Sequence, residues 1–167
     1  NRQDTANAKT IGSINTVLAA LEAGLEATRK AIHDHIGNHP DLKNRGGLLS
    51  TIPGIGEASV AHLLIASGGH HGFTKAKQVV AFAGLAPALR QSGQWPGNTH
   101  IAQNGDALLR KALYMPALPA LRFNPPIRVF CERLKANGKD GKAIACAAMR
   151  KLIHIAFGVL KSGKPFG

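Results

Sequence analysis

The sequence predicts a mainly α protein, in which a long helical arm precedes a compact helical domain. Apolar side chains recur at helical spacing through most of the 167 residues. Clusters of proline, glycine and asparagine separate these apolar segments into successive helices. Because 44% of the residues are hydrophobic, the chain is expected to bury a core and not to be disordered.

A heptad pattern predicts the arm, which covers residues 1–40. The apolar residues that form the pattern follow one another at steps of 3, 4, 3, 4 and 7: Ile11, Ile14, Leu18, Leu21, Leu25 and Ile32. Such a seam is typical of a coiled coil, and a helix from Ile11 to Ile36 would be roughly 40 Å long. The run Gly37-Asn38-His39-Pro40 ends this helix and provides a hinge. We expect the arm to pair with another helix, in the same chain or in a second copy.

The domain of residues 41–167 begins with a segment, residues 44–67, that looks like a helix-hairpin-helix. Pro53 presets a tight turn, and Gly54 and Gly56 permit backbone angles that a side chain would forbid. Ile55 can tuck under the turn as an apolar plug. The N–H groups of Gly54, Ile55 and Gly56, next to a helix start, can bind a phosphate. The segment therefore favours a nucleic-acid backbone as ligand, and its alternative is a Gly-rich turn in a helical bundle.

Four more helices are expected, and capping or helix-breaking residues bound the first three. The first covers Lys75 to Ala83 and follows a Thr74 cap, and the second runs from Asp106 to about Ala117, where Pro116 and Pro119 bend or end it. The third runs from Pro125-Pro126 to Asn137-Gly138, and the fourth from Lys142 to Lys161. Between the first two of them, residues 84–105 are rich in glycine and proline. These residues predict one long loop, extended or irregular, and not a helix.

Charge is concentrated after the hairpin. Residues 1–57 carry six basic and six acidic side chains, whereas residues 58–167 carry fifteen Lys or Arg against three acids. An excess of that sign attracts polyanions, which include nucleic acids and anionic membrane surfaces. No apolar run approaches the roughly 20 residues that cross a bilayer, so we expect a soluble protein without a membrane partner.

Metal chemistry is not expected from this chain. Asp106, Glu132 and Asp140 are scattered, which argues against a nuclease that holds its own pair of metal ions. The eight histidines and two cysteines do not match the usual zinc-ligand spacings, and Cys131 and Cys146 are expected to be free thiols.

The loop of residues 84–105 is the remaining candidate for chemistry. It places Arg90 shortly before Ser92-Gly93, where the serine hydroxyl can be presented to a phosphate. A serine hydroxyl is a weak nucleophile unless a base or a metal activates it. Arg90, Arg110 and Lys111 could stabilise the charge on the phosphorus. The alternative is that Ser92 is an ordinary turn residue.

The order of these motifs resembles that of a known family. The runs that carry the resemblance are Ile52-Pro53-Gly54-Ile55-Gly56, Gly84-Leu85-Ala86-Pro87, Ser92-Gly93, Ile101 through Gly105, and Leu108-Leu109-Arg110-Lys111-Ala112-Leu113-Tyr114. Together they look like the C-terminal domain of the Piv/MooV-type recombinases, the "one-ten" family of bacterial insertion-sequence transposases. The resemblance covers roughly residues 45–160, and the heptad arm is similar to the coiled coil that precedes this domain in the family.

The resemblance implies a DNA recombinase that works as a homo-oligomer in the bacterial cytoplasm, associated with the nucleoid, and that uses a guide-type RNA. In the family a RuvC-like N-terminal domain holds Mg²⁺ with acidic residues, and the C-terminal domain supplies a serine nucleophile, which falls at Ser92. Arg90 and Arg110 would hold the phosphate, with Gly93, Lys111 and the hairpin glycines at the DNA. Because Asn1 is not a Met, we expect a piece of a longer chain whose metal-binding half lies upstream, and an inactive fragment without it.

The sequence also departs from the family pattern. Ala102-Gln103 stands where Ser-Lys is common, and Asp106 where Asn is usual. Two alternatives remain open at this stage. One is a helix-hairpin-helix module of a repair or recombination protein that binds DNA without catalysis, and the other is a dimerisation domain whose basic surface binds RNA incidentally.

Overall fold

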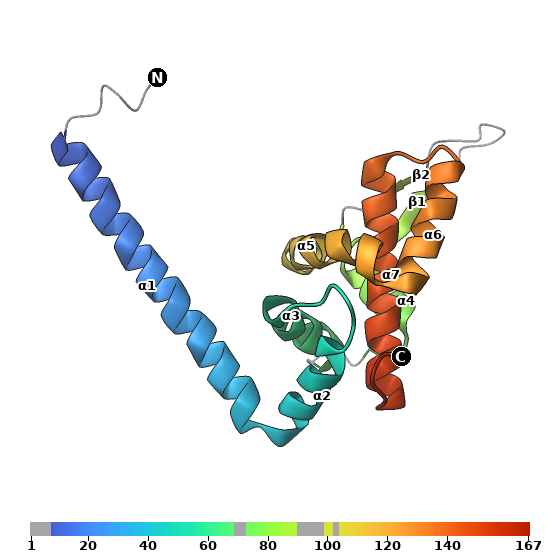
Figure 1. The fold of residues 1–167 in the computed structure, drawn as a ribbon, viewed down its shortest axis with the longest axis horizontal. Helices are drawn as coiled ribbons and strands as arrows, with labels where there is room; N and C mark the ends of the chain where they lie inside the picture. The colour runs from blue at the N-terminus through green and yellow to red at the C-terminus, as the bar shows by residue number, and fades with distance from the viewer. Residues whose placement is uncertain (1–7, 69–72, 90–98, 102–103) are drawn as a thin grey trace. The chain divides into compact units, whose positions relative to one another are not determined.

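The computed structural model describes residues 8–68, 73–89, 99–101 and 104–167, and in these residues it contains seven helices and one two-stranded sheet (Figure 1). The prediction of a mainly α protein is confirmed. The chain forms two compact units, residues 1–40 and 41–167, which are described separately below.

The first unit is one long helix, α1 (Ala8–Asn38). Its 31 residues correspond to about 46 Å at 1.5 Å per residue. All six residues of the heptad seam are exposed, from 42% at Ile11 to 65% at Leu21. The predicted helix is therefore confirmed, while its pairing with a second helix stays a prediction.

The second unit contains the other six helices and the sheet. In chain order these elements are α2 (Pro40–Ser50), α3 (Glu57–Gly68), α4 (Ala76–Phe82), β1 (Pro87–Leu89), β2 (Thr99–Ile101), α5 (Ala107–Phe123), α6 (Pro125–Ala136) and α7 (Gly141–Ser162). Helix α7 is the central element, because α4, α5 and α6 all pack on it. Its buried face includes Ala148, Leu152, Ile153 and Ala156.

Helix α7 is also the one described helix that is long and apolar enough to cross a membrane, which the expectation from the sequence overlooked. Length and composition alone do not distinguish a membrane span from a buried helix. Seven side chains of α7 are buried among the other helices. We therefore interpret α7 as a core helix.

Helix α5 continues through both of its prolines to Phe123, so the expectation that it ends near Ala117 is wrong. A proline inside a helix costs about 3 kcal/mol, because it removes a backbone hydrogen bond and clashes with the preceding turn. Here Leu113, Pro116, Ala117 and Ala120 are all buried, and α5 packs on α3, α6 and α7. Burial of this face offsets the local cost of the prolines.

Local capping residues set most of the other boundaries. The carboxylate of Asp106 accepts a hydrogen bond of 2.9 Å from the Leu109 amide, and that of Asp140 one of 2.6 Å from the Ala143 amide. Pro125 opens α6 as expected. The prediction that Thr74 caps α4 is wrong. Lys75 is the N-cap, and the side-chain oxygen of Gln78 accepts a hydrogen bond of 2.9 Å from the Lys75 amide.

Candidate functional site

A short β-ribbon flanks the segment that carries Ser92. Strands β1 and β2 are antiparallel, with Pro87 opposite Ile101 and Leu89 opposite Thr99. The sequence predicted only an extended or irregular segment here, so the pairing is new. Arg90, Ser92 and Gly93 lie outside the described residues, between the paired Leu89 and Thr99. The ribbon brings the two ends of the Ser92 segment side by side.

Two glycines fix the base of this ribbon. Gly84 has a φ of +65°, in the left-handed region that favours glycine. A Cβ atom on Gly105 would lie 2.5 Å from the α carbon of Gly84 and 2.5 Å from the carbonyl oxygen of Phe82. The amide of Asp106 donates a hydrogen bond of 2.7 Å to that same oxygen. The chain before β1 and the chain after β2 are thus in backbone contact, with no room for a side chain between them.

Arg110 holds the same junction from α5. Its Nη1 donates a hydrogen bond of 3.0 Å to the carbonyl oxygen of Ala83, at the end of α4. The guanidinium is also near Cys146 on α7. Burial has the largest effect on the pKa of the Cys146 thiol and raises it, and the negative charge of Asp140 raises it further, whereas the positive charge of Arg110 lowers it. A guanidinium has five N–H donors, so the bond to Ala83 leaves donors free for a second acceptor.

An open groove of about 420 Å³ adjoins Arg110. Five of its lining residues lie on α5 and one on α7: Ala107, Arg110, Lys111, Tyr114, Met115 and Met149. Tyr114 is 47% exposed and Met115 68% exposed. Two cations beside an exposed aromatic ring form a combination that suits a nucleic-acid strand. Tyr114 was not among the predicted site residues, although its spacing of three from Lys111 on a helix could have indicated it.

The hairpin glycines have different roles. Gly54 has a φ of +102°, and a Cβ on it would lie 2.7 Å from the carbonyl oxygen of Pro116 and 2.9 Å from the Cβ of Ala120. Ile55 is only 8% exposed, and its amide donates to the Ile52 carbonyl at 3.0 Å. Gly56 is exposed, with open space around its Cβ position.

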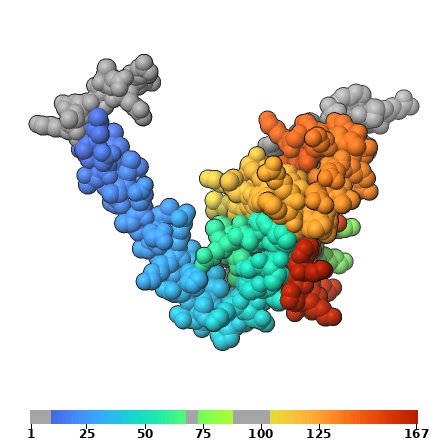
Figure 2. Space-filling view, in the orientation of Figure 1, coloured from blue at the N-terminus to red at the C-terminus, as the bar shows by residue number. Residues whose placement is uncertain are grey.

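Gly54 therefore packs the turn against α5, and Ile55 is buried. Figure 2 shows the teal and green surface of this region in contact with the yellow surface of α5. Gly56 is the accessible member of the predicted phosphate contact, at the start of α3. Binding of a backbone by this turn stays a prediction.

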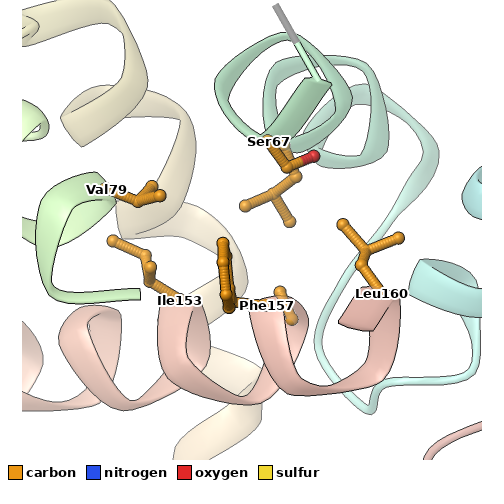
Figure 3. A pocket seen from close by; sticks show the side chains of 7 residues that line it. Ser67, Val79, Ile153, Phe157 and Leu160 are labelled. Carbon is orange, nitrogen blue, oxygen red and sulfur yellow. The ribbon is translucent and has the colours of Figure 1, made fainter. Parts of the chain in front are cut away.

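A second cavity, between α3, α4 and α7, is too small for a ligand. Its volume is about 10 Å³, roughly that of one water-sized sphere. Figure 3 shows Val79, Ile153, Phe157 and Leu160 around it, with Ser67 at its edge. The Ser67 hydroxyl donates to the Leu64 carbonyl at 3.3 Å and accepts a bond of 3.3 Å from Arg45. This cavity is a packing gap between apolar side chains.

The acidic residues after the hairpin do not fit a Mg²⁺ site. Asp106 and Asp140 cap helices, and Glu132 pairs with Arg128 at 4.0 Å. Among the described residues, no three His, Cys, Asp or Glu side chains are placed to share an ion. The two cysteines are free thiols, as expected, and burial raises the pKa of Cys131.

The chain is similar to a family of transposases. The model of the "Transposase IS116/IS110/IS902 family" matches residues 46–132, more than half of the chain. The "Pilin gene-inverting protein" of Moraxella bovis is 40% identical over 129 residues, which are 76% of this chain and 40% of that protein.

Two insertion-element proteins also match. A 43.6 kDa protein of insertion element IS110 from Streptomyces coelicolor is 26% identical over 155 residues, and a 42 kDa protein of IS900 from Mycobacterium paratuberculosis is 28% identical over 143 residues. These matches cover 91% and 85% of this chain but only 38% and 35% of the relatives. The chain thus spans about two fifths of the length of the proteins that it matches.

Proposed function

The chain belongs to the IS116/IS110/IS902 transposase family, and on that basis we propose that it supplies the serine nucleophile of a DNA recombinase. The proposed nucleophile is Ser92, acting in strand cleavage and exchange during transposition. The name of the Moraxella relative, which describes inversion of a gene, supports DNA as the substrate. Family membership favours this activity over a binding module without catalysis.

The β1–β2 ribbon is the single observation that best supports this assignment. A reactive residue on a loop needs a scaffold that returns it to the same position in each catalytic cycle. Here the base of the loop is fixed three times: by the contact of Gly105 with Gly84, by the bond from Asp106 to Phe82, and by the bond from Arg110 to Ala83. An ordinary surface turn would not require this many contacts.

In the proposed step the Ser92 oxygen attacks a DNA phosphorus. The Oγ–P bond forms, the P–O bond to one deoxyribose oxygen breaks, and the serine proton is transferred to the leaving oxygen. Arg90 and Arg110 would bind the non-bridging oxygens, whose negative charge increases in the transition state. Reverse attack by a second DNA end on the phosphoserine restores the hydroxyl and joins the strands without loss of bond energy.

Other components would lie outside this chain. The described carboxylates are not clustered for Mg²⁺, and the metal expected for the family would be held by a RuvC-like domain elsewhere in the protein. A guide-type RNA would select the DNA, and the exposed seam of α1 would join copies of the protein. We expect the complex to act in the bacterial cytoplasm, at the nucleoid.

The test uses the full-length protein with DNA that carries its recombination sites. After denaturation, the wild type should carry covalently bound DNA, and mass spectrometry should find the phosphoester on the peptide that contains Ser92. Ser92→Ala should abolish both the adduct and strand exchange. Ser162→Ala is the matched control, because that exposed hydroxyl donates to the Val159 carbonyl at 3.1 Å and accepts from the Lys164 amide at 3.3 Å, both at the end of α7. Recombination by Ser92→Ala would disprove the assignment.

A further inference from the structure

A surface built from three helices gathers cations for which the described residues show no ion pair with a carboxylate. Its members come from α4, α6 and α7, and together they form what we name the α7 cation surface: Lys77, Arg133, Arg150, Lys151 and His154. We propose that this surface binds the phosphodiester backbone of duplex DNA. The proposal rests on the proposed function, because it concerns how the same protein holds its DNA. None of these residues belongs to the ribbon base or to the groove beside Arg110.

An aromatic ring links two of the helices. The Nζ of Lys151 lies 5.9 Å from the centroid of the Phe130 ring, and the Cζ of Arg133 lies 5.7 Å from the same centroid. Each cation is attracted to the ring electrons, which limits the freedom of two long side chains. Arg133 and Lys151 are both exposed, so an anion can reach both of them at the ring.

His154 extends the surface toward α4. It is exposed on α7, one turn after Arg150 and Lys151. The charged groups that act on it are Arg150 and Lys151 from its own helix and Lys77 from α4, all of them cationic. Partial burial, the largest effect, and then these three cations hold the pKa of His154 below its usual value of 6.5. In the free protein these effects disfavour the protonated form of the imidazole.

Within the described part of the domain, no carboxylate after residue 57 pairs with this surface. Only three carboxylates occur after residue 57, and each is engaged elsewhere: Asp106 and Asp140 cap helices, and Glu132 pairs with Arg128. The Nε of Arg150 is buried and has no hydrogen-bond partner within the part of the chain that the structure describes. Uncompensated like charges repel one another, so an external anion that binds here relieves this repulsion.

Duplex DNA suits the surface better than a small anion does. The cations are distributed over three helices, whereas one phosphate can contact only the few side chains within hydrogen-bonding distance. A duplex carries one negative charge for about every 1.7 Å of its axis, so its row of phosphates can contact cations that are distributed over three helices. The phosphates would also oppose the lowering of the His154 pKa by the neighbouring cations, because a nearby negative charge stabilises the imidazolium and raises its pKa.

The coupling between proton binding at His154 and DNA binding fixes how the affinity for DNA changes with pH. If the pKa of His154 is higher in the DNA complex than in the free protein, the complex binds more protons, and affinity must increase as the pH falls. Because the free value lies below 6.5, the increase should occur mainly between pH 7.5 and pH 5.5. Carboxylates titrate lower, and lysines and arginines higher, than this range.

The experiment measures binding of the 167-residue chain to a fluorescent duplex of about 20 base pairs, at constant ionic strength, at pH 7.5 and pH 5.5. We expect the affinity of the wild type to increase about three- to tenfold on acidification, since a shift of one pKa unit corresponds to a factor of ten. His154→Gln should remove most of this increase, and His62→Gln, an exposed histidine on α3, should retain it. NMR titration of the His154 ring should give a higher pKa with DNA than without it.

The cations are tested by salt dependence. Lys77→Ala and Lys151→Ala should each weaken binding at pH 7.5 and reduce the slope of log K against log salt by about one. Lys151→Arg should restore both values. Lys161→Ala, an exposed lysine in the last turn of α7, should change the affinity less than twofold. Circular dichroism should show an unchanged fold, because the substituted side chains are exposed.

Three results would overturn the proposal: Lys77→Ala and Lys151→Ala variants that behave like Lys161→Ala, a pH dependence that survives in His154→Gln, or a surface that binds an RNA hairpin of equal charge more tightly than the duplex. Failure of the proposed function is a separate result. A Ser92→Ala protein that still recombines DNA would remove the nucleophile, yet it would leave a proton-linked DNA surface on α7 intact.

Discussion

Gly105 lies directly on Gly84, so close that a Cβ atom on Gly105 would approach the Gly84 α carbon to 2.5 Å. The first residue precedes α5 and the second follows α4, and the β1–β2 ribbon with the Ser92 segment lies between them in sequence. This contact joins the entry and the exit of the candidate catalytic loop. Four predictions follow from this contact and from others like it, together with the exposed seam of α1.

The first concerns Gly105. Gly105→Ala should force the ends of the ribbon apart, because the added methyl group meets backbone atoms that cannot move aside. We expect adduct formation by the full-length protein to fall at least about tenfold, together with a loss of about 2–4 kcal/mol in the free energy of unfolding. Gly47→Ala is the control, because Gly47 is exposed in α2 with open space around its Cβ position. An adduct yield equal to wild type would show that the ribbon base does not position Ser92.

The second separates packing from binding in the hairpin. Gly54→Ala should destabilise the domain by about 2–4 kcal/mol, because Gly54 has a φ of +102° and faces the Pro116 carbonyl of α5. Thermal unfolding followed by circular dichroism measures this loss. Gly56→Ala should leave the unfolding temperature nearly unchanged, since its Cβ position is open.

Gly56→Ala also tests the predicted phosphate contact. If the turn holds a backbone, an added methyl group beside the N-terminus of α3 should weaken duplex binding in a fluorescence assay, by about three- to tenfold for the loss of one contact. Unchanged binding with an intact fold would reduce the hairpin to a structural element.

The third compares Arg110 with its neighbour. Arg110→Ala removes the bond to the Ala83 carbonyl and should lower the free energy of unfolding by about 1–2 kcal/mol, as well as reducing adduct formation. Lys111→Ala should weaken DNA binding with little change in stability, because Lys111 is exposed beside the groove. Arg110→Lys keeps the positive charge, but a lysine cannot both bond to the Ala83 carbonyl and make two parallel hydrogen bonds to a phosphate. Adduct formation by this variant should therefore stay low. Recovery of full activity by this lysine would contradict a bidentate role.

The fourth concerns the exposed seam of α1. Leu18→Glu and Leu21→Glu place charges where the apolar stripe would meet a second helix, and both should convert an oligomer to monomers in analytical ultracentrifugation. Glu26→Gln is the control, because this residue is off the seam and its ion pair with Arg29, at 3.7 Å, is exposed. A wild-type chain that stays monomeric at the same concentration would refute pairing through the arm.

Much of the secondary structure could be predicted because its causes are local. Asp106 caps a helix that starts one residue later, and Pro125 opens α6, each through contacts within a few residues. The heptad of α1 likewise depends only on spacing along one helix. The Ser92 assignment also came from the order of motifs in the sequence, and the described residues do not test it.

The rest depends on contacts between distant residues, which one sequence does not reveal. Helix α5 passes through Pro116 and Pro119 because its buried face packs on α3, α6 and α7. The ribbon exists because segments on either side of Ser92 pair, and strands of three residues are too short to be recognised by alternation.

By itself, then, the sequence determined the helical class, the positions of most helix ends, the family, and the charge excess after the hairpin. Tertiary structure decided what the residues do in space. It placed Gly54 against α5 and buried Ile55, joined Gly84 to Gly105 at the base of the ribbon, and brought Lys77, Lys151 and His154 onto one surface. The physical reason is that caps and heptads act over a few residues, whereas close packing and summed charge depend on which helices meet.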